Sequence, residues 1–347
     1  MQICICRVRV EYRTIEEWCE ILDSQRIPIT AKNRIEGPYP YYGANGIQGY
    51  VNDYIFDDEL VLLAEDGGNF GSKDRPIAYR VSGKCWVNNH AHVLKPKNDL
   101  NVDYLCYSLM FYNTNGLVNG ATRQKLPQST MRKMKIPYLE INKQQEIVQK
   151  IKKIESILSD LNGQLDLLDE LVKARFVEMF GEIEDCDKWE SKIWNEVVTI
   201  KNGRDYKKVL VSDGGYPVVG TGGEIARASK YLCPENTIVV GRKGSINNPM
   251  LMKEKFWNVD TAFGVIPNSD YLHYQYFYCF CKFYNFMKLN KATTLPSTTK
   301  ADLLKIRINI PPLELQNQFA SFVEEVDKSR LHEQLAVEYV KLLAKDL

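Results

Sequence analysis

The sequence lacks the features of a membrane protein, a disulfide-bonded secreted protein or a zinc protein. Its apolar runs all fall short of the roughly 18 residues that a membrane span needs, and no cleavage site typical of a signal peptide follows Met1 to Val10. The nine cysteines have no disulfide-like spacing, and Cys4/Cys6 and Cys279/Cys281 are C-x-C rather than C-x-x-C pairs. We therefore expect a cytoplasmic chain with reduced cysteines, no metal site and no membrane contact.

The sequence also lacks the common motifs of catalysis. No Walker A motif is present, and neither Asn248-Pro249-Met250 nor the run from Asn309 to Leu313 fits the Asp/Asn-Pro-Pro-aromatic motif of an amino-methyltransferase. Gly220 to Gly223 lacks the full G-x-G-x-x-G of a dinucleotide-binding loop, and the four histidines have neither triad nor ligand spacing. We predict a non-catalytic chain that holds no cofactor of its own.

The net charge of +1 conceals an uneven distribution of charge. Residues 192–311 contain 17 Lys and Arg against 9 Asp and Glu, whereas residues 11–139 contain 15 of each kind. Residues 140–190 contain 7 basic against 13 acidic residues, and residues 312–347 contain 4 against 7. The basic segment favours a polyanionic partner, although a solubilising surface would have the same composition.

A heptad pattern occupies the middle of the chain. Apolar residues recur there with alternating steps of four and three, which predicts a coiled-coil helix. We expect the helix to continue to Phe180 and to end at Gly181, because glycine favours the C-terminus of a helix. The predicted stripe consists of Ile147, Ile151, Ile154, Leu158, Leu161, Leu165, Leu168 and Val172.

The two halves of the chain repeat each other. The matches keep the same order in both halves, and their separations change only slightly, which indicates an internal duplication with short insertions. The matched pairs include Tyr39-Pro40 with Tyr216-Pro217, Gly67 with Gly244, Lys84-x-Trp86 with Lys255-x-Trp257, Leu126-Pro127 with Leu295-Pro296, and Ile136-Pro137 with Ile310-Pro311.

The second half ends, like the first, in a helical pattern. The pattern lapses at Ser329 and Arg330 and then resumes. Two acidic amphipathic helices in one duplicated chain predict an antiparallel pair around a pseudo-twofold axis; packing of each helix on its own domain is the alternative. The predicted stripe of the second helix consists of Leu315, Phe319, Phe322, Val326, Leu335, Tyr339 and Leu342.

The predicted fold class is α+β, with two similar mixed α/β domains joined by an antiparallel coiled coil of two long helices. β-rich runs at 54–64, 237–241 and 256–265 are broken by turns, and aromatic-rich runs at 104–112 and 271–287 predict helices. The predicted boundaries are 1–139 for the first domain, 140–181 for the first spacer helix, 182–311 for the second domain and 312–347 for the second spacer helix.

Four stretches carry a resemblance to a known family. Residues 37–47 are similar to the opening of many target recognition domains, and residues 54–67 and 237–246 are similar to two variants of a second motif. Residues 310–316 look like the entry into the family's helical region. With the duplication, these motifs make the chain resemble the specificity subunit of type I restriction-modification systems over nearly its whole length.

The resemblance implies a DNA-recognition subunit. In that family each target recognition domain reads one half of a split double-stranded DNA target through the major groove. The spacer helices set the gap between the half-sites and hold two modification subunits, which are adenine methyltransferases. S-adenosylmethionine, ATP and magnesium are therefore expected on the methyltransferase and restriction/translocase partner subunits.

Three loops that recur in both halves are the candidates for DNA contact, because Lys and Arg suit phosphates while Arg, Asn, Gln and hydroxyl groups suit base edges. In one of them, Glu65-Asp66 corresponds to Arg242-Lys243, an inversion of charge that either divergent base readout or surface drift would produce. The predicted DNA-contacting residues are Tyr42, Asn45, Gly46, Glu65, Lys73, Arg75, Arg80, Arg123, Gln124, Lys125, Arg204, Lys207, Lys208, Thr221, Arg242, Lys243, Ser245, Thr293, Thr294 and Lys300.

Three alternatives stay open at this point. One is the recognition subunit of a related bifunctional restriction-methylation system. Another is a free-standing methyltransferase or nuclease, against which the missing motifs argue. The last is a coiled-coil interaction protein that does not bind DNA.

Overall fold

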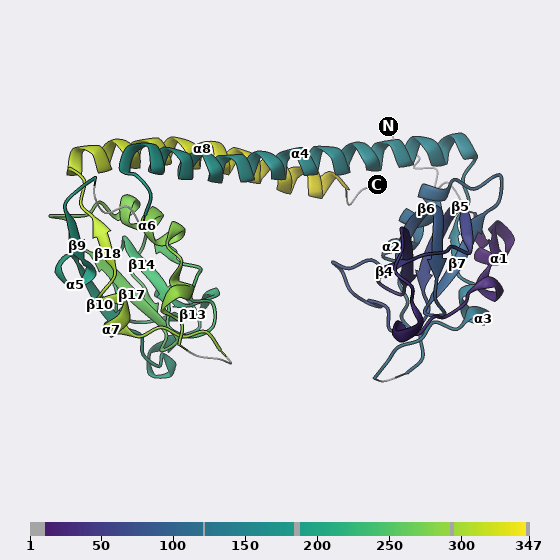
Figure 1. The fold of residues 1–347 in the computed structure, drawn as a ribbon, viewed down its shortest axis with the longest axis horizontal. Coiled ribbons are helices and arrows are strands. Elements are labelled where there is room, and N and C mark those ends of the chain that lie inside the picture. Colours follow the sequence, from purple (N-terminus) through teal and green to yellow (C-terminus); the bar gives the residue numbers. More distant parts are fainter. Residues whose placement is uncertain (1–10, 121, 184–187, 292–294, 345–347) are drawn as a thin grey trace, which may run out of the picture. The chain divides into compact units, whose positions relative to one another are not determined.

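A computed structural model describes residues 11–120, 122–183, 188–291 and 295–344 of the chain (Figure 1). The described residues up to Ile157 belong to one compact unit, and residues Leu158 to Leu342 form a second. The boundary between the units falls inside a long helix. The predicted domain boundaries at 139/140, 181/182 and 311/312 stay predictions.

The first unit is built on a six-stranded sheet of order β2-β7-β5-β6-β3-β4 and a two-stranded sheet of β1 and β8. Neighbouring strands run antiparallel except β3 and β6. The strands are β1 (Tyr12–Thr14), β2 (Cys19–Ile21), β3 (Tyr39–Gly43), β4 (Gly46–Val51), β5 (Phe56–Ala64), β6 (Ala78–Val87), β7 (Ala91–Pro96) and β8 (Lys135–Pro137). The helices are α1 (Ile15–Trp18), η1 (Asp23–Gln25), η2 (Ala31–Asn33), α2 (Val102–Met110), α3 (Gln128–Met131) and the start of α4 (Ile141–Phe180).

The second unit repeats this order of elements. Its sheets have the orders β10-β17-β14-β15, β11-β13-β12-β16 and β18-β9. The strands are β9 (Ser191–Ile193), β10 (Val198–Asn202), β11 (Leu210–Val211), β12 (Tyr216–Gly220), β13 (Gly223–Ala228), β14 (Thr237–Gly241), β15 (Met250–Met252), β16 (Trp257–Asn258), β17 (Ala262–Pro267) and β18 (Arg307–Asn309). The helices are α5 (Trp194–Val197), η3 (Lys207–Val209), α6 (Tyr274–Phe283), η4 (Phe286–Leu289), α7 (Lys300–Leu303) and α8 (Leu313–Leu343).

One strand explains why the two units differ in their sheets. In the first unit β6 is continuous and pairs with β5 and, near its end, with β3, so that a single sheet results. In the second unit the corresponding segment is interrupted at 253–256. Its first part, β15, pairs with β14, and its second part, β16, pairs with β12. The same plan therefore gives one sheet in the first unit and two in the second.

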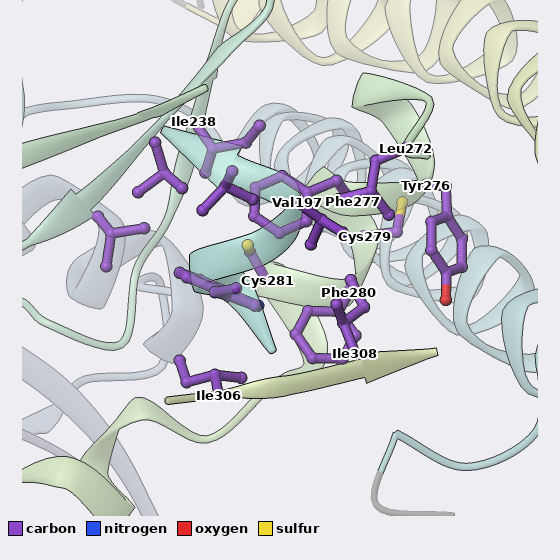
Figure 2. Packing of buried hydrophobic residues seen from close by; sticks show 14 of the residues in the cluster. Val197, Ile238, Leu272, Tyr276, Phe277, Cys279, Phe280, Cys281, Ile306 and Ile308 are labelled. Atoms are coloured by element: carbon purple, nitrogen blue, oxygen red, sulfur yellow. The ribbon is translucent and has the colours of Figure 1, made fainter. Parts of the chain in front are cut away.

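The core of the second unit is rich in aromatic residues of α6. Phe277, Phe280 and Cys281 are buried together with Ile306 and Ile308, which flank or lie on β18 (Figure 2). The tyrosines and phenylalanines of 271–284 are thus mainly core residues, because most of their rings are buried in this cluster or packed against it. None of the described helices is long and apolar enough to cross a bilayer.

Helix α4 confirms the predicted end of the first heptad pattern. The helix continues to Phe180, and Gly181 has a φ of 89°, with its N–H donated to the carbonyl of Val177 at 2.8 Å. This left-handed conformation closes the helix and suits glycine.

Helices α4 and α8 run antiparallel within the second unit. The ring of Phe176 lies 5.6 Å from that of Phe319, and Asp169, further back along α4, pairs with Arg330, further forward along α8. Val172, Phe176 and Phe180 join Phe319, Val323 and Val326 in one buried cluster. These contacts agree with the predicted antiparallel pair over this stretch.

The predicted stripe of α8 is wrong in its second half. Leu335, Tyr339 and Leu342 are 56%, 62% and 57% exposed, whereas Val337 is buried. The heptad continues without a lapse through Val323, Val326, Arg330, Glu333, Val337 and Val340, all of them buried or half-buried. Arg330 occupies a core position because its charge is paired there, so the true stripe includes a polar residue that a search for apolar spacing passes over.

Candidate nucleic-acid interface

Backbone hydrogen bonds join the predicted loops of the first unit. The N–H of Gly67 is donated to the carbonyl of Gln124 at 2.9 Å, and that of Leu126 to the carbonyl of Glu65 at 2.7 Å. The N–H of Glu65 bonds the carbonyl of His90 at 2.8 Å. Three segments from different parts of the sequence, 65–67, 88–91 and 123–126, therefore form one loop cluster after strand β5.

The second unit repeats these bonds at corresponding positions. The N–H of Gly244 donates to the carbonyl of Pro296 at 2.9 Å, and the N–H of Thr298 donates to the carbonyl of Arg242 at 3.0 Å. The N–H of Arg242 donates to the carbonyl of Thr261 at 2.8 Å. Gly67 and Gly244 have φ values of 71° and 82°, a conformation that a side chain would strain. The two loop clusters thus have the same backbone.

These bonds and the positions of the elements correct two matches in the predicted repeat. Leu126 corresponds to Thr298, 172 residues later, and not to Leu295 as the Leu-Pro dipeptides suggest. Helices α3 and α7 and strands β8 and β18 keep the same separation of 172, so Ile136-Pro137 corresponds to Ile308-Asn309 and not to Ile310-Pro311. Lys125 therefore corresponds to Ser297, which forms a bridge with Lys243 as Lys125 does with Asp66. The sequence prediction missed Ser297 because of the wrong register.

Glu65 is a buried structural residue. Its carboxylate lies 2.6 Å from Nη1 of Arg26 and 3.1 Å from Nζ of Lys125, and the residue is only 8% exposed. Arg26 also bonds the carbonyl of Ala91 at 2.7 Å. A buried carboxylate that already forms these two ion pairs stabilises the loop, and it is a poor acceptor for a cytosine amino group.

Three consecutive side chains of this loop cluster, Arg123, Gln124 and Lys125, are exposed. Arg123 pairs with Asp66 at 2.8 Å and is 59% exposed, so the acid at the tip is largely neutralised. Lys125 is exposed, and the exposed side chain of Gln124 has no hydrogen-bond partner among the described residues. The surface therefore presents an amide and two cationic groups together with one paired acid.

The second unit presents a different set of side chains on the same backbone. Arg242, Lys243 and Ser245 are exposed. The guanidinium of Arg242 lies 3.4 Å from the carbonyl of Asp260 and 5.9 Å from the ring centre of Phe263. No ion pair of Arg242 or Lys243 occurs in the described part of the chain, so both charges are available to an anion.

The hairpin turns lie beside these loops in the first unit. Nδ2 of Asn45 is donated to the carbonyl of Gly67 at 3.0 Å, which ties the β3–β4 turn, including Gly46, to the loop cluster. Tyr42 is half-buried against Tyr79, so its ring is less accessible than predicted. In the second unit Thr221 is half-buried in the β12–β13 turn.

The predicted phosphate contacts fall into two groups. Arg80 pairs with Glu59 and, at 2.9 Å, with Asp103 of α2, so it links β6 to a helix and is not free for a phosphate. Lys300 donates to the carbonyl of Ile200 at 2.8 Å. The second group is exposed and makes no ion pair within the described part of the chain; it comprises Lys73, Arg75, Arg204, Lys207 and Lys208. Thr293 and Thr294 lie outside the described residues.

A buried cluster of Asp23, Glu65 and His92 could suggest a metal site. His92 lies 2.6 Å from Asp23 through Nδ1 and 2.9 Å from the carbonyl of Leu126 through Nε2. A carbonyl accepts only, so Nε2 donates its hydrogen to Leu126, while Nδ1 lies against the carboxylate of Asp23. Arg26 supplies the neutralising charge among the carboxylates. The donor set fits a hydrogen-bonded ion network that holds the loop cluster, and not a metal.

The family model of the type I restriction modification DNA specificity domain matches residues 7–168 and, again, residues 186–338. The chain belongs to this family. Two matches in one chain confirm the internal duplication, and they make the chain a type I restriction-modification specificity subunit, the component that recognises a DNA sequence.

Relatives and solved structures agree with this assignment. The specificity subunit is 29% identical to a protein of Haemophilus influenzae assigned as a type I restriction enzyme specificity subunit, over 92% of this chain and 88% of the relative. It is 25% identical to the EcoprrI specificity subunit of Escherichia coli over 38% of this chain and 33% of that protein. The fold is similar to that of the S subunit from M. genitalium, with a TM-score of 0.64, 14% identity and coverage of 100% and 96% of the two chains.

Proposed function

We propose that the specificity subunit reads a bipartite double-stranded DNA target, one half-site per repeated domain. The observation that carries the proposal is the pair of loop clusters, which share their backbone hydrogen bonds but present different side chains. A common scaffold with divergent exposed groups is what two readers of different base sequences need, because base edges are read by side chains while the backbone fixes their placement.

The exposed groups have the chemistry of base and phosphate contact. Arg242 can donate two hydrogen bonds to guanine, and Lys243 suits either guanine or a phosphate. In the first domain, Gln124 can pair with adenine, while Arg123 and Lys125 offer cationic donors. Adjacent cations such as Lys207 and Lys208 would bind the DNA backbone without reading sequence.

An exposed apolar stripe on α8 supports the proposal that partner subunits dock on the spacer helices. Leu331, Leu335, Tyr339 and Leu342 are each more than half exposed, although they follow one another at helical spacing. Large exposed apolar patches on a helix favour contact with another protein. We propose that methyltransferase subunits, with their S-adenosylmethionine, bind there, and that restriction/translocase subunits with ATP and magnesium join the complex, so that all catalysis lies on the partners.

Genome-wide mapping of adenine methylation tests the bipartite reading. The chain would be expressed with its methyltransferase partner, first unchanged and then with 242–245 replaced by the corresponding residues 65–68. We expect one half of the methylated target to change while the other half and the gap stay the same. An exchange at Lys253 and Lys255, which lie between β15 and β16, serves as the control and should leave the target unchanged. Changes in both half-sites, or no sequence-dependent methylation by the unchanged chain, would refute the proposal.

A further inference from the structure

A buried glutamine lies at the base of each spacer helix. Gln144, in the first turn of α4, and Gln316, in the first turn of α8, are both 0% exposed. A fully buried amide has to satisfy its hydrogen-bonding groups within the protein, because a buried polar group without a partner destabilises the fold. The partners of these two side chains therefore show what they hold together.

Gln144 joins its spacer helix to the loop that begins helix α2. Its Nε2 donates to the carbonyls of Asp99 at 2.9 Å and Leu139 at 2.7 Å, and its Oε1 accepts the N–H of Asn101 at 2.8 Å. Asn101 is the N-cap residue of α2, and α2 packs on the core of the domain. One side chain thus bonds the domain and the short connection into the spacer helix at once.

Gln316 makes the same three bonds in the second unit. Its Nε2 donates to the carbonyls of Tyr271 at 2.9 Å and Pro311 at 2.8 Å, and its Oε1 accepts the N–H of His273, the N-cap residue of α6, at 2.8 Å. Each partner lies 172 residues after its counterpart in the first unit.

A tyrosine completes the arrangement in both units. The hydroxyl of Tyr104 donates to the carbonyl of Pro137 at 3.0 Å, and that of Tyr276 donates to the carbonyl of Asn309 at 3.0 Å. Both carbonyls belong to the strand that leads into the spacer helix. We call each set of one glutamine and one tyrosine a clasp.

The clasp is retained in both units with the same geometry. The proposed DNA-reading loops differ in charge between the two units, and the sheets differ in continuity. The donor–acceptor distances of the four clasp bonds nevertheless agree between the units to within 0.1 Å. The chain between the domain and its spacer helix is only a few residues long, at 138–140 and 310–312. A planar amide bonded on three sides fixes the direction in which the helix leaves the domain.

We propose that Gln144 and Gln316 are positioning residues, which hold each recognition domain at a fixed angle on its spacer helix and so determine how strictly the gap between half-sites is measured. This inference rests on the proposed function. It assigns the precision of the gap to the clasps, and the identity of the bases to the loop clusters.

The test uses the full complex with its methyltransferase and DNA duplexes that carry the mapped target with the native gap or with one base pair added or removed. We compare Gln144→Met and Gln316→Met, which keep the length of the side chain but lose its hydrogen bonds, with Gln145→Met and Gln318→Met, exposed neighbours on the same helices. For the clasp variants we expect the ratio of methylation rates on native and altered gaps to fall about tenfold, with base preference unchanged. The controls should match the unchanged chain.

A folded clasp variant that keeps the wild-type ratio would overturn the inference. If the methionine variants do not fold, Tyr104→Phe removes a single bond of the clasp, and a ratio equal to that of the unchanged chain would overturn the inference in the same way. Failure of the unchanged chain to support target-dependent methylation would instead refute the proposed function, so the two failures are distinguishable.

Discussion

Asp169 of α4 forms an ion pair with Arg330 of α8, with 2.8 Å between Oδ1 and Nη2. The same carboxylate accepts a hydrogen bond from Lys282 of α6 at 2.9 Å. One acid therefore joins the two spacer helices and the domain that packs beneath them. Because Arg330 occupies a core position of the heptad, this pair also specifies the register of α8 on α4, as polar core residues do in coiled coils.

Replacement of Asp169 by Asn should lower the free energy of unfolding by about 1 kcal/mol, because the carboxylate is half exposed and solvent weakens both pairs. Burial raises the pKa of Asp169, but Lys282 and Arg330 outweigh it and lower the pKa below its ordinary value of 3.8. A carboxyl group with a lowered pKa in the folded protein stabilises the fold above pH 3.8. This stabilisation is lost as the pH falls through the pKa of the folded protein. The difference between the two proteins in chemical denaturation should therefore shrink below about pH 4. Asp166→Asn, an exposed neighbour, is the control.

Phe176→Ala should destabilise the second unit by about 3–5 kcal/mol. The ring is 2% exposed and contacts Tyr276 of α6 and Phe319 of α8, so truncation leaves a cavity where three helices meet. Thermal or urea unfolding measures the loss. Leu167→Ala, on the same helix but 62% exposed, should change stability by less than about 0.5 kcal/mol. Equal effects of the two substitutions would contradict the packing of α4 described above.

Replacement of Leu335 and Tyr339 by Asp and Ala should weaken binding of the methyltransferase partner at least about tenfold without altering the unfolding of the isolated chain. Both side chains are exposed on α8, so their loss removes contact area only when a partner is present. Titration calorimetry measures the affinity. His332→Ala, an exposed residue on the same helix, is the control, and undiminished affinity of the double variant would exclude this stripe as the docking surface.

Lys243→Ala should weaken DNA binding and reduce the slope of log affinity against log salt by about one, as expected for the loss of one phosphate contact. Arg242→Ala should lower the preference for the cognate half-site as well, since a bidentate contact to guanine discriminates by about 1–3 kcal/mol. Fluorescence anisotropy at several salt concentrations measures both. Lys253→Ala, an exposed lysine near α4 and α8, should leave the slope unchanged.

Asp23→Ala should destabilise the first unit by about 3 kcal/mol, because it removes a buried carboxylate that pairs with Arg26 and hydrogen-bonds His92. Unfolding of the full chain followed by hydrogen exchange locates the loss in the loops of that unit. Asp74→Ala, exposed in the same unit, should have little effect. Stability equal to that of the unchanged chain would contradict the role assigned to the buried network.

The sequence was sufficient to predict the duplication, the two long helices and the loops that recur in both halves, because these depend on periodicity and on glycine positions. It failed where two apolar stripes compete on one helix. Leu335 and Tyr339 form an apolar stripe with regular helical spacing. The structure instead buries Val337, because the charge of Arg330 is paired at a core position of the same heptad. Glu65 shows a second limit. The sequence predicts that it contacts DNA, and only the three-dimensional neighbours Arg26 and Lys125 reveal that it is buried.

The loop clusters are held by main-chain bonds between segments such as 65–67 and 124–126, and those bonds do not depend on which side chains project outward. Mutation at the projecting positions therefore carries little folding cost, and it needs no compensating change elsewhere. Under the proposed function, a few substitutions at these positions change the target without changing the fold. The two halves present different exposed side chains on the same backbone, Arg123, Gln124 and Lys125 in one and Arg242, Lys243 and Ser245 in the other.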